Sequence, residues 1–328
     1  YVIDSLNADK PYDQFVREQV AGDLLPADSE QQRIDHVLAT GFLGLGVRNL
    51  GEQDAKILRS EEIAEQIDTL GRAFLGLNLI CARCHDHKFA PISTEDYHGL
   101  AGIFQSTEIL SGFGRLGKRR STVSRNDLLV LAAAAPRDEF QQAQRALTAE
   151  LEEMQEEIEY WQLQKRVLED AEPFDKKALE QCFTTMRELK EKWRKLNASL
   201  AVKFPLAMAV RDTSTVANVR IQIGGDPYKL GPEVQRGFLE ALHSGDPIPA
   251  DSSGRMELAK WLSSRNNPLV ARVFVNRVWH HLFGRGLVTT VDDFTPSGSK
   301  PSHPKLLDYL AVSFMDNDWS LKYLIRQI

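Results

Sequence analysis

Two apolar seams in the middle of the chain constrain its fold more than any other feature. In both seams apolar side chains recur mainly at alternating steps of three and four residues, which places each set on one helix face. The first seam comprises Phe140, Leu147, Leu151, Met154, Ile158, Trp161 and Leu168, and the second Leu179, Cys182, Met186, Leu189, Trp193, Leu196 and Leu200. The short turn that ends at Pro173 predicts an antiparallel coiled-coil hairpin over residues 127–203. Its seams need no ligand, and its outer surface can hold a protein partner or a second subunit.

The other segments complete a mainly α-helical, multidomain protein. Residues 1–126 predict a helical domain, whose clearest helix runs from Glu61 to Ile80 with apolar residues every three or four positions. Residues 204–250 predict a small β-containing segment, with strands at 207–210 and 219–223. Residues 251–328 predict a second helical domain with helices that begin near Arg255, Pro268, Pro301 and Leu321.

The strongest functional signal is the pentapeptide Cys81-Ala82-Arg83-Cys84-His85, which contains two of the three cysteines in the chain. The pattern C-x-x-C-H is the attachment site of c-type haem. The thiols of Cys81 and Cys84 would form thioethers with the haem vinyl groups, and His85 would ligate the iron. A possible distal ligand is His98, with Met208, His281 and His303 as further candidates.

Other interpretations of the motif remain open. Cys81, Cys84 and either His85 or His87 are plausible ligands of a structural zinc ion. A redox dithiol is less consistent with the sequence, because that motif expects a βαβ context and here a helix precedes it. A site without any metal is the third alternative.

A second concentration of polar residues lies in the C-terminal segment. Arg272, Asn276 and Arg277 share one predicted helix, His280 and His281 follow, and Asp292, Asp293 and His303 lie on predicted loops. If these residues converge, they predict a substrate or metal site with His281 or His303 as general base. The alternative is that Arg277 and the other arginines pair with aspartates and tie loops to helices. The candidate catalytic residues are therefore His281, His303, Asp293 and Arg277.

Charge and hydropathy exclude some classes of protein. The net charge of −6 argues against extended nucleic-acid binding. The basic stretch from Arg115 to Arg125 is expected to be a solvated loop. No apolar run reaches the roughly 18 residues of a membrane span. Haem c would place the protein in the periplasm or at the cell surface, because this haem is attached outside the cytoplasm.

Long motifs resemble the planctomycete-type cytochrome C domain and the domain that usually follows it. The first domain's motifs are Thr40-Gly41-Phe42-Leu43, Phe74-Leu75-Gly76-Leu77, residues 81–89, Pro91-Ile92 and Asp96-Tyr97. The second domain's motifs are Asn267-Pro268-Leu269, residues 271–279, residues 283–288, Asp292-Asp293-Phe294 and Pro301-Ser302-His303-Pro304. The resemblance implies an exported bacterial protein, often beside another cytochrome c module, with no settled reaction. It also implies that relatives extend beyond both ends of this chain, and that His98 stands where tyrosine is usual.

Three functions follow as competing hypotheses. The first is a haem c protein that transfers electrons to a partner protein or cytochrome module, or oxidises a substrate. The second is a hydrolase or carbohydrate-active enzyme with a structural zinc at the C-x-x-C-H motif and a polar pocket in residues 251–328. The third is a cell-surface scaffold that uses the predicted hairpin. Haem content, zinc content and partner binding distinguish them.

Overall fold

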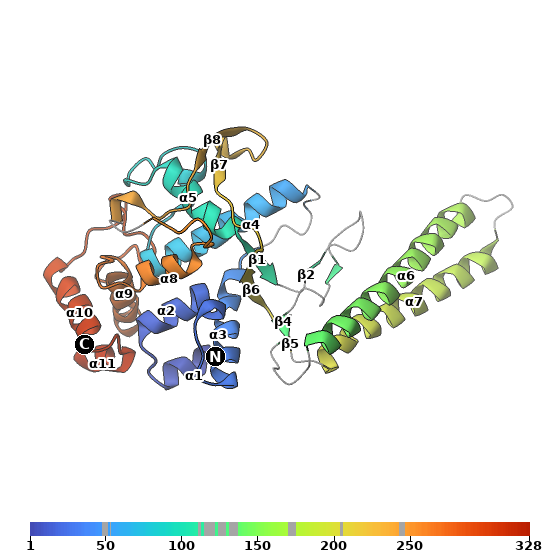
Figure 1. Ribbon diagram of the computed structural model, residues 1–328, viewed down its shortest axis with the longest axis horizontal. Coiled ribbons are helices and arrows are strands. Elements are labelled where there is room, and N and C mark those ends of the chain that lie inside the picture. Colours follow the sequence, from blue (N-terminus) through green and yellow to red (C-terminus); the bar gives the residue numbers. More distant parts are fainter. Residues whose placement is uncertain are drawn as a thin grey trace. The chain divides into compact units, whose positions relative to one another are not determined.

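A computed structural model describes residues 1–47, 52, 54–110, 113–114, 122–123, 129–130, 137–169, 175–203, 206–242 and 247–328 (Figure 1). The protein is mainly helical, as predicted. The α-helices are α1 Val2–Asn7, α2 Tyr12–Ala21, α3 Glu30–Thr40, α4 Ala55–Leu70, α5 Thr94–Gln105, α6 Arg137–Glu169, α7 Lys176–Lys203, α8 Arg255–Leu262, α9 Val270–Phe283, α10 Pro304–Asp316 and α11 Leu321–Gln327. The short strands are β1 Thr107–Leu110, β2 Phe113–Gly114, β3 Thr122–Val123, β4 Leu129–Val130, β5 Leu206–Ala207, β6 Ala209–Asp212, β7 Val219–Gln222 and β8 Leu230–Val234.

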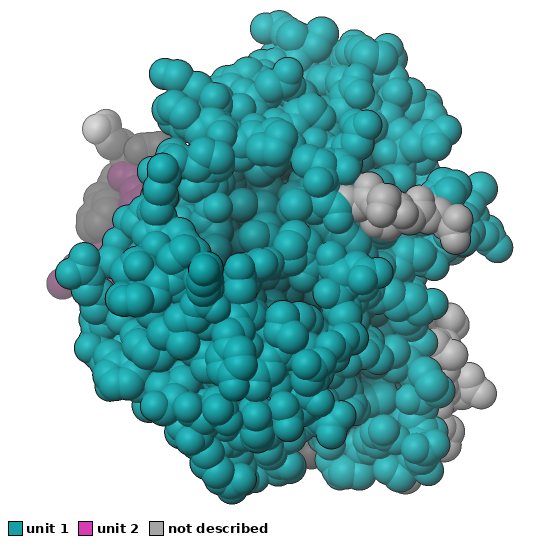
Figure 2. Space-filling model, turned by 90° about the vertical axis from the view of Figure 1, so that its left-hand side faces the viewer, with its two compact units in different colours: residues 1–109, 209–328 teal, residues 110–208 magenta. Residues whose placement is uncertain are grey.

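The chain forms two compact units (Figure 2). Unit 1 contains Tyr1–Ile109 and Ala209–Ile328, and unit 2 contains Leu110–Met208. One hydrophobic core in unit 1 joins Leu70, Val210, Leu258 and Phe314, which the sequence places in three different segments. These three segments share a core because short amphipathic helices bury too little apolar surface on their own.

Aromatic rings connect the two ends of the chain within this core. The ring of Tyr12 on α2 stacks on that of Phe274 on α9, with centroids 3.7 Å apart. Phe274 in turn stacks on Phe314 of α10 at 5.3 Å. Both chain ends therefore contribute to the same apolar interior of unit 1.

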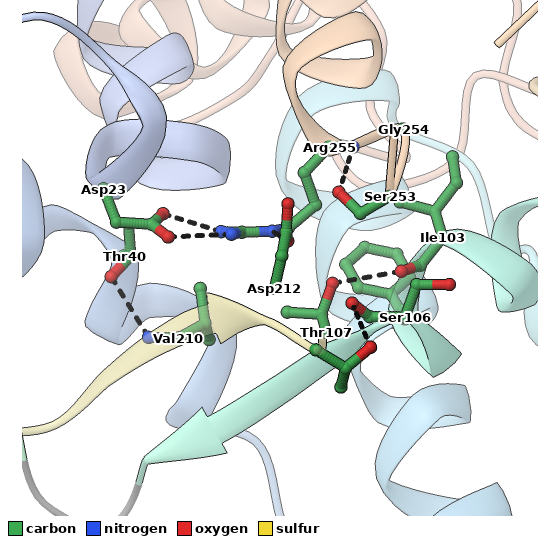
Figure 3. A network of polar contacts seen from close by, with 12 residues as sticks. Asp23, Thr40, Ile103, Ser106, Thr107, Val210, Asp212, Ser253, Gly254 and Arg255 are labelled. Atoms are coloured by element: carbon green, nitrogen blue, oxygen red, sulfur yellow. Dashed lines mark hydrogen bonds and ion pairs between the residues drawn. The ribbon is translucent and has the colours of Figure 1, made fainter. Parts of the chain in front are cut away.

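A buried arginine links three distant segments of unit 1 (Figure 3). Arg255, the first residue of α8, is 0% exposed. Its guanidinium donates to both carboxylate oxygens of Asp23 at 2.7 and 2.8 Å, and its Nε donates to Asp212 at 2.6 Å. Asp23 lies in the 3-10 helix η1 (Gly22–Leu24), and Asp212 ends β6. The two carboxylates compensate the buried charge, which would otherwise be costly to remove from water.

The helix before the cysteine motif ends earlier than the sequence predicts. The α-helical part of α4 stops at Leu70, and one π-helical turn, η3 (Gly71–Leu75), follows. Gly76 then adopts a left-handed conformation with φ of +61°, which favours glycine and ends helices. The motif lies on a separate 3-10 turn, η4 (Ile80–Arg83), rather than at the end of a helix continuous to Ile80.

The strands of the described residues form two-stranded ladders. The segment predicted as one strand at 207–210 is divided at Met208: β5 pairs with β4, whereas β6 pairs with β1. β7 pairs antiparallel with β8, with Val219 opposite Val234. No sequence pattern predicted β1, β2, β3, β4 or β8. The expected basic loop from Arg115 to Arg125 lies outside the described residues except for Thr122 and Val123.

Unit 2 contains the two long helices, α6 and α7, which run antiparallel and pack along each other (Figure 1). The predicted seam residues Leu151 and Ile158 on α6, and Cys182 and Leu189 on α7, are buried. The Cys182 thiol on α7 donates to the carbonyl oxygen of Trp161 on α6 at 3.4 Å, so these two residues lie opposite each other along the helix pair. Supercoiling of the two helices as a true coiled coil stays a prediction. The predicted seam also includes Phe140 and Leu200, whose side chains are not among those that the structure describes.

Replacement of the buried arginine should destabilise unit 1 strongly. Arg255→Leu leaves two largely buried carboxylates without their partner, so the free energy of unfolding should fall by about 3–5 kcal/mol. The matched control is Arg265→Leu, which removes a pair with Asp316 whose side chains are each 54% exposed. That change should cost at most about 1 kcal/mol. Urea unfolding measures the loss of unfolding free energy in each variant. Equal losses in Arg255→Leu and Arg265→Leu would contradict the role assigned to Arg255.

Candidate functional site

The thiols of the C-x-x-C-H motif are accessible. Cys81 and Cys84 are exposed and free of disulfide bonds. In a 3-10 helix the side chains at positions i and i+3 are eclipsed, so Cys81 on η4 and Cys84 at its C-cap project from the same side. This is the arrangement that two thioethers to one ligand require.

His85, the next residue, is exposed and held by its own loop. Its Nδ1 lies 2.8 Å from the carbonyl oxygen of Asp86, so Nδ1 carries the proton in this contact. The tautomer that results leaves the lone pair of Nε2 available. A histidine whose second ring nitrogen donates to a backbone carbonyl is the usual arrangement of metal-ligating imidazoles.

Polar contacts close the loop that follows the motif. The Asp86 carboxylate accepts the N–H of Thr94 at 2.8 Å, at the first turn of α5. His87 Nδ1 accepts the N–H groups of Phe89 and Ala90 at 3.2 and 3.0 Å. Because both hydrogen bonds use the lone pair of His87 Nδ1, this atom holds the loop in place and is not available to a metal ion. The motif is thus tied directly to α5.

A glycine pair in the middle of the chain packs against the motif. Gly225, with φ of +76°, lies so close to Cys84 that a Cβ atom would meet Sγ at 2.6 Å. Arg83 donates to the Gly225 carbonyl at 3.3 Å and to the Ser60 hydroxyl at 3.0 Å. The predicted β-containing segment over residues 204–250 does not include this contact. The two adjacent glycines were the available signal, because they permit close backbone approach.

His98 is a structural residue in this geometry. It is 1% exposed, its Nδ1 lies 2.8 Å from the Thr94 carbonyl, and its Nε2 accepts the Gln222 N–H at 2.9 Å. Burial lowers the pKa of His98, with a further contribution from the charge of Arg83. Nδ1 bonds within α5 and Nε2 joins α5 to β7, so both ring nitrogens are already used and His98 takes no part as an iron ligand in the function that we propose.

The polar residues of the C-terminal segment make separate structural contacts. Arg277 on α9 donates to the carbonyls of Arg72 and Ala73 and pairs with Asp292 at 2.9 Å. Asn276 is fully buried and exchanges two hydrogen bonds with the backbone of Val288, at 2.8 and 2.9 Å. These contacts agree with the interpretation that the polar groups tie loops to helices.

The remaining candidates of this segment also have local partners. Asp293 accepts from the backbone N–H and the hydroxyl of Thr295, at 2.9 and 2.5 Å. His303 is the exposed N-cap residue of α10, and its Nδ1 lies 3.1 Å from the hydroxyl of Ser302. Exposed His281 lies beside His280, with ring centroids 5.6 Å apart. Arg272 pairs with Asp308 at 2.7 Å rather than with the predicted loops.

Across the part of the chain that the structure describes, no group of three or more His, Cys, Asp and Glu side chains is arranged to hold a metal ion. The same residues include no helix that is long and apolar enough to cross a membrane.

Comparison with known families recovers the resemblance seen in the sequence. Residues 1–109 match PSCyt2, a protein family of unknown function (DUF1549). Residues 254–328 match PSD1, a second family of unknown function (DUF1553). The two matches correspond to the pair of domains that the sequence motifs resemble. Both matched regions lie in unit 1, and the PSCyt2 match ends at Ile109, where unit 1 is interrupted by unit 2. No curated protein and no solved structure matches the chain.

The contact between Gly225 and Cys84 can be tested with the adjacent glycine as control. Gly224 also has a positive φ, of +62°, but a Cβ there would meet nothing within 4 Å. Gly224→Ala should cost about 1–2 kcal/mol of unfolding free energy from backbone strain alone. Gly225→Ala should cost more and displace the sulfur, which changes the rate of thiol modification at Cys84 in a Cys81→Ser background. Equal costs with an unchanged modification rate would argue against the contact.

The lowered pKa of His98 predicts a specific pH dependence. Because the folded pKa lies below the unfolded value of about 6.5, the neutral ring stabilises the fold fully above that pH. This contribution is lost as the pH falls from about 6.5 through the folded pKa. His98→Leu leaves the Gln222 N–H without its acceptor and should cost about 1–3 kcal/mol at pH 8. Chemical unfolding at pH 8 and pH 5 measures the difference in unfolding free energy between wild type and His98→Leu. This difference should be smaller at pH 5, and an equal difference at both pH values would refute the prediction.

Proposed function

We propose that this chain is a c-type haem protein that transfers electrons, with haem attached at Cys81, Cys84 and His85. One observation carries the proposal. Two exposed, unpaired thiols project from the same side of one 3-10 turn, beside an exposed imidazole whose Nδ1 is held by the Asp86 carbonyl. Covalent haem attachment needs two accessible thiols and an available imidazole nitrogen, and the motif is the pattern on which that attachment depends.

The residues present fit the group chemically. The thiols supply the thioethers, and His85 Nε2 supplies the nitrogen ligand of the iron. The Asp86 carbonyl fixes the ring orientation and its tautomer, and the Asp86 carboxylate anchors the loop to α5. Bound haem supplies one-electron chemistry at its iron, with a potential set by the axial ligands and surroundings.

Apolar surface beside the motif supports the same proposal. Phe89 on the loop after the motif is 55% exposed, and Ile223, two residues before Gly225, is 56% exposed. Large exposed apolar side chains often mark binding surfaces. A haem held at the motif offers a large apolar surface that such side chains can cover.

Compartment and partners follow from this chemistry. Haem is attached to such sites outside the cytoplasm, so we place the protein in the periplasm or at the cell surface. The electron partner is a redox protein or another cytochrome module. In this proposal α6 and α7 form a coiled coil that can hold a protein partner.

The hydrolytic alternative has less support among the described residues. Arg277 and Asp292 are paired with each other, and Asp293 stabilises its own turn. His281 and His303 are exposed, and no metal-binding group includes them.

Haem attachment is tested by a pyridine haemochrome spectrum of protein made in a host with active cytochrome c maturation. Wild type should show about one thioether-linked haem per chain. The double variant Cys81→Ala/Cys84→Ala should lose covalent haem, and His85→Ala should lose the spectrum of a nitrogen-ligated iron. Cys182→Ala is the matched control, because this third cysteine is buried in unit 2 and should leave haem content unchanged.

Metal analysis of the same preparations distinguishes the alternatives. A colourless wild type from cells that mature another c-type cytochrome would overturn the proposal. One equivalent of zinc that is lost in Cys81→Ala/Cys84→Ala would then establish the structural zinc site.

A further inference from the structure

The turn between β7 and β8 contacts two other parts of unit 1 (Figure 1). We call residues 223–229 the hairpin tip. Within it, the backbone of Gly225 lies against the sulfur of Cys84. Three residues later, Tyr228 donates its phenol hydrogen to Asp54 Oδ2 at 2.5 Å. The hairpin tip therefore connects the cysteine motif to the beginning of α4.

Asp54 is a well-fixed acceptor for this phenol. It is the N-cap residue of α4, and its Oδ1 accepts the N–H groups of Lys56 and Ile57 at 2.8 and 3.1 Å, while its Oδ2 accepts from Tyr228. The ammonium group of Lys56 lies 4.7 Å from the centroid of the Tyr228 ring, where a cation is attracted to the aromatic face. The hydrogen bond to Asp54 raises the pKa of Tyr228, so the phenol stays protonated as a donor at neutral pH.

The hairpin tip is internally connected, so a contact at Tyr228 also fixes Gly225. The Asp226 carboxylate accepts the Tyr228 N–H at 2.9 Å, and the Asp226 N–H donates to the Ile223 carbonyl at 3.3 Å. The Lys229 carbonyl accepts the Ile223 N–H at 2.8 Å. These bonds close a turn that contains Gly225. A displacement of Tyr228 would therefore move Gly225 with it.

The base of the hairpin is held by other contacts. Gln222 donates its N–H to His98 Nε2 at 2.9 Å, and its side chain accepts the Ser60 hydroxyl at 2.8 Å. These bonds do not involve Tyr228 and would remain without it. Loss of the Tyr228 contact would therefore act on the hairpin tip and on the motif that the tip contacts.

We propose that Tyr228 is a positioning residue of the haem site, because its bond to Asp54 keeps Gly225 against Cys84. The Cys84 sulfur cannot turn into the space that Gly225 occupies, so it is held where it projects from the same side of η4 as Cys81. Two thioethers to one ligand require both sulfurs at defined positions. This inference rests on the proposed function, and it adds a residue far from the motif in sequence to the site.

Thiol modification of the haem-free full chain tests the positioning directly. Tyr228→Phe removes the donor and keeps the aromatic ring. In a Cys81→Ser background Cys84 is the exposed thiol, because Cys182 is buried. Release of the hairpin tip should raise the rate at which iodoacetamide modifies Cys84 by about two- to tenfold, the range expected for the loss of one hydrogen bond.

The matched control for this variant is Tyr309→Phe. Tyr309 and Tyr228 are both 58% exposed, but Tyr309 lies on α10 in the C-terminal segment. Its replacement removes an equally accessible phenol and should leave the modification rate of Cys84 unchanged.

The mode of haem attachment separates positioning from a general loss of stability. A haem bound through one sulfur keeps an unreacted vinyl group, which shifts its pyridine haemochrome band to longer wavelength. In a host with active cytochrome c maturation, Tyr228→Phe should raise the fraction of such haem at least about twofold over wild type and Tyr309→Phe. A merely less stable chain would contain less haem without any change in this fraction.

The outcomes distinguish this inference from the proposed function. An unchanged fraction of singly attached haem in Tyr228→Phe, with haem bound in wild type, would overturn the positioning role and leave the proposed function standing. A wild type without covalent haem would overturn both.

Discussion

The ion triad of Arg255, Asp23 and Asp212 is the interaction on which unit 1 depends most. A guanidinium that is 0% exposed cannot remain charged in the core without partners, and its two carboxylates come from segments separated by about half the chain. The triad therefore ties η1, in the region that matches PSCyt2, and β6 to the beginning of the region that matches PSD1. The two matched regions are thus joined by one core and one charge network, although unit 2 separates them in sequence.

The geometry of the cysteine motif depends on the same unit. Cys84 is placed by η4, but it packs against Gly225, and Arg83 reaches both Ser60 on α4 and the Gly225 carbonyl. His98 then joins α5 to β7 through its Nε2, while its Nδ1 bonds to the Thr94 carbonyl within α5. A segment between the two family matches thus supports the candidate site from one side. The support is rigid because its hydrogen bonds are made by buried or backbone groups, which lose more when unpaired than exposed groups do.

The sequence by itself determined the periodic and local features. Seam spacing identified the two long helices, Pro268 and Pro301 marked the approximate starts of α9 and α10, and the motif identified Cys81, Cys84 and His85 as candidates, because these signals act within a few residues. Tertiary structure decided what distant residues do. The roles of Arg255, Gly225 and His98, the pairing of β1 with β6, and the separate contacts of Arg277, Asp293 and His303 depend on approaches between segments far apart in the chain. Such contacts are set by the packing of the whole core, and no local spacing records them.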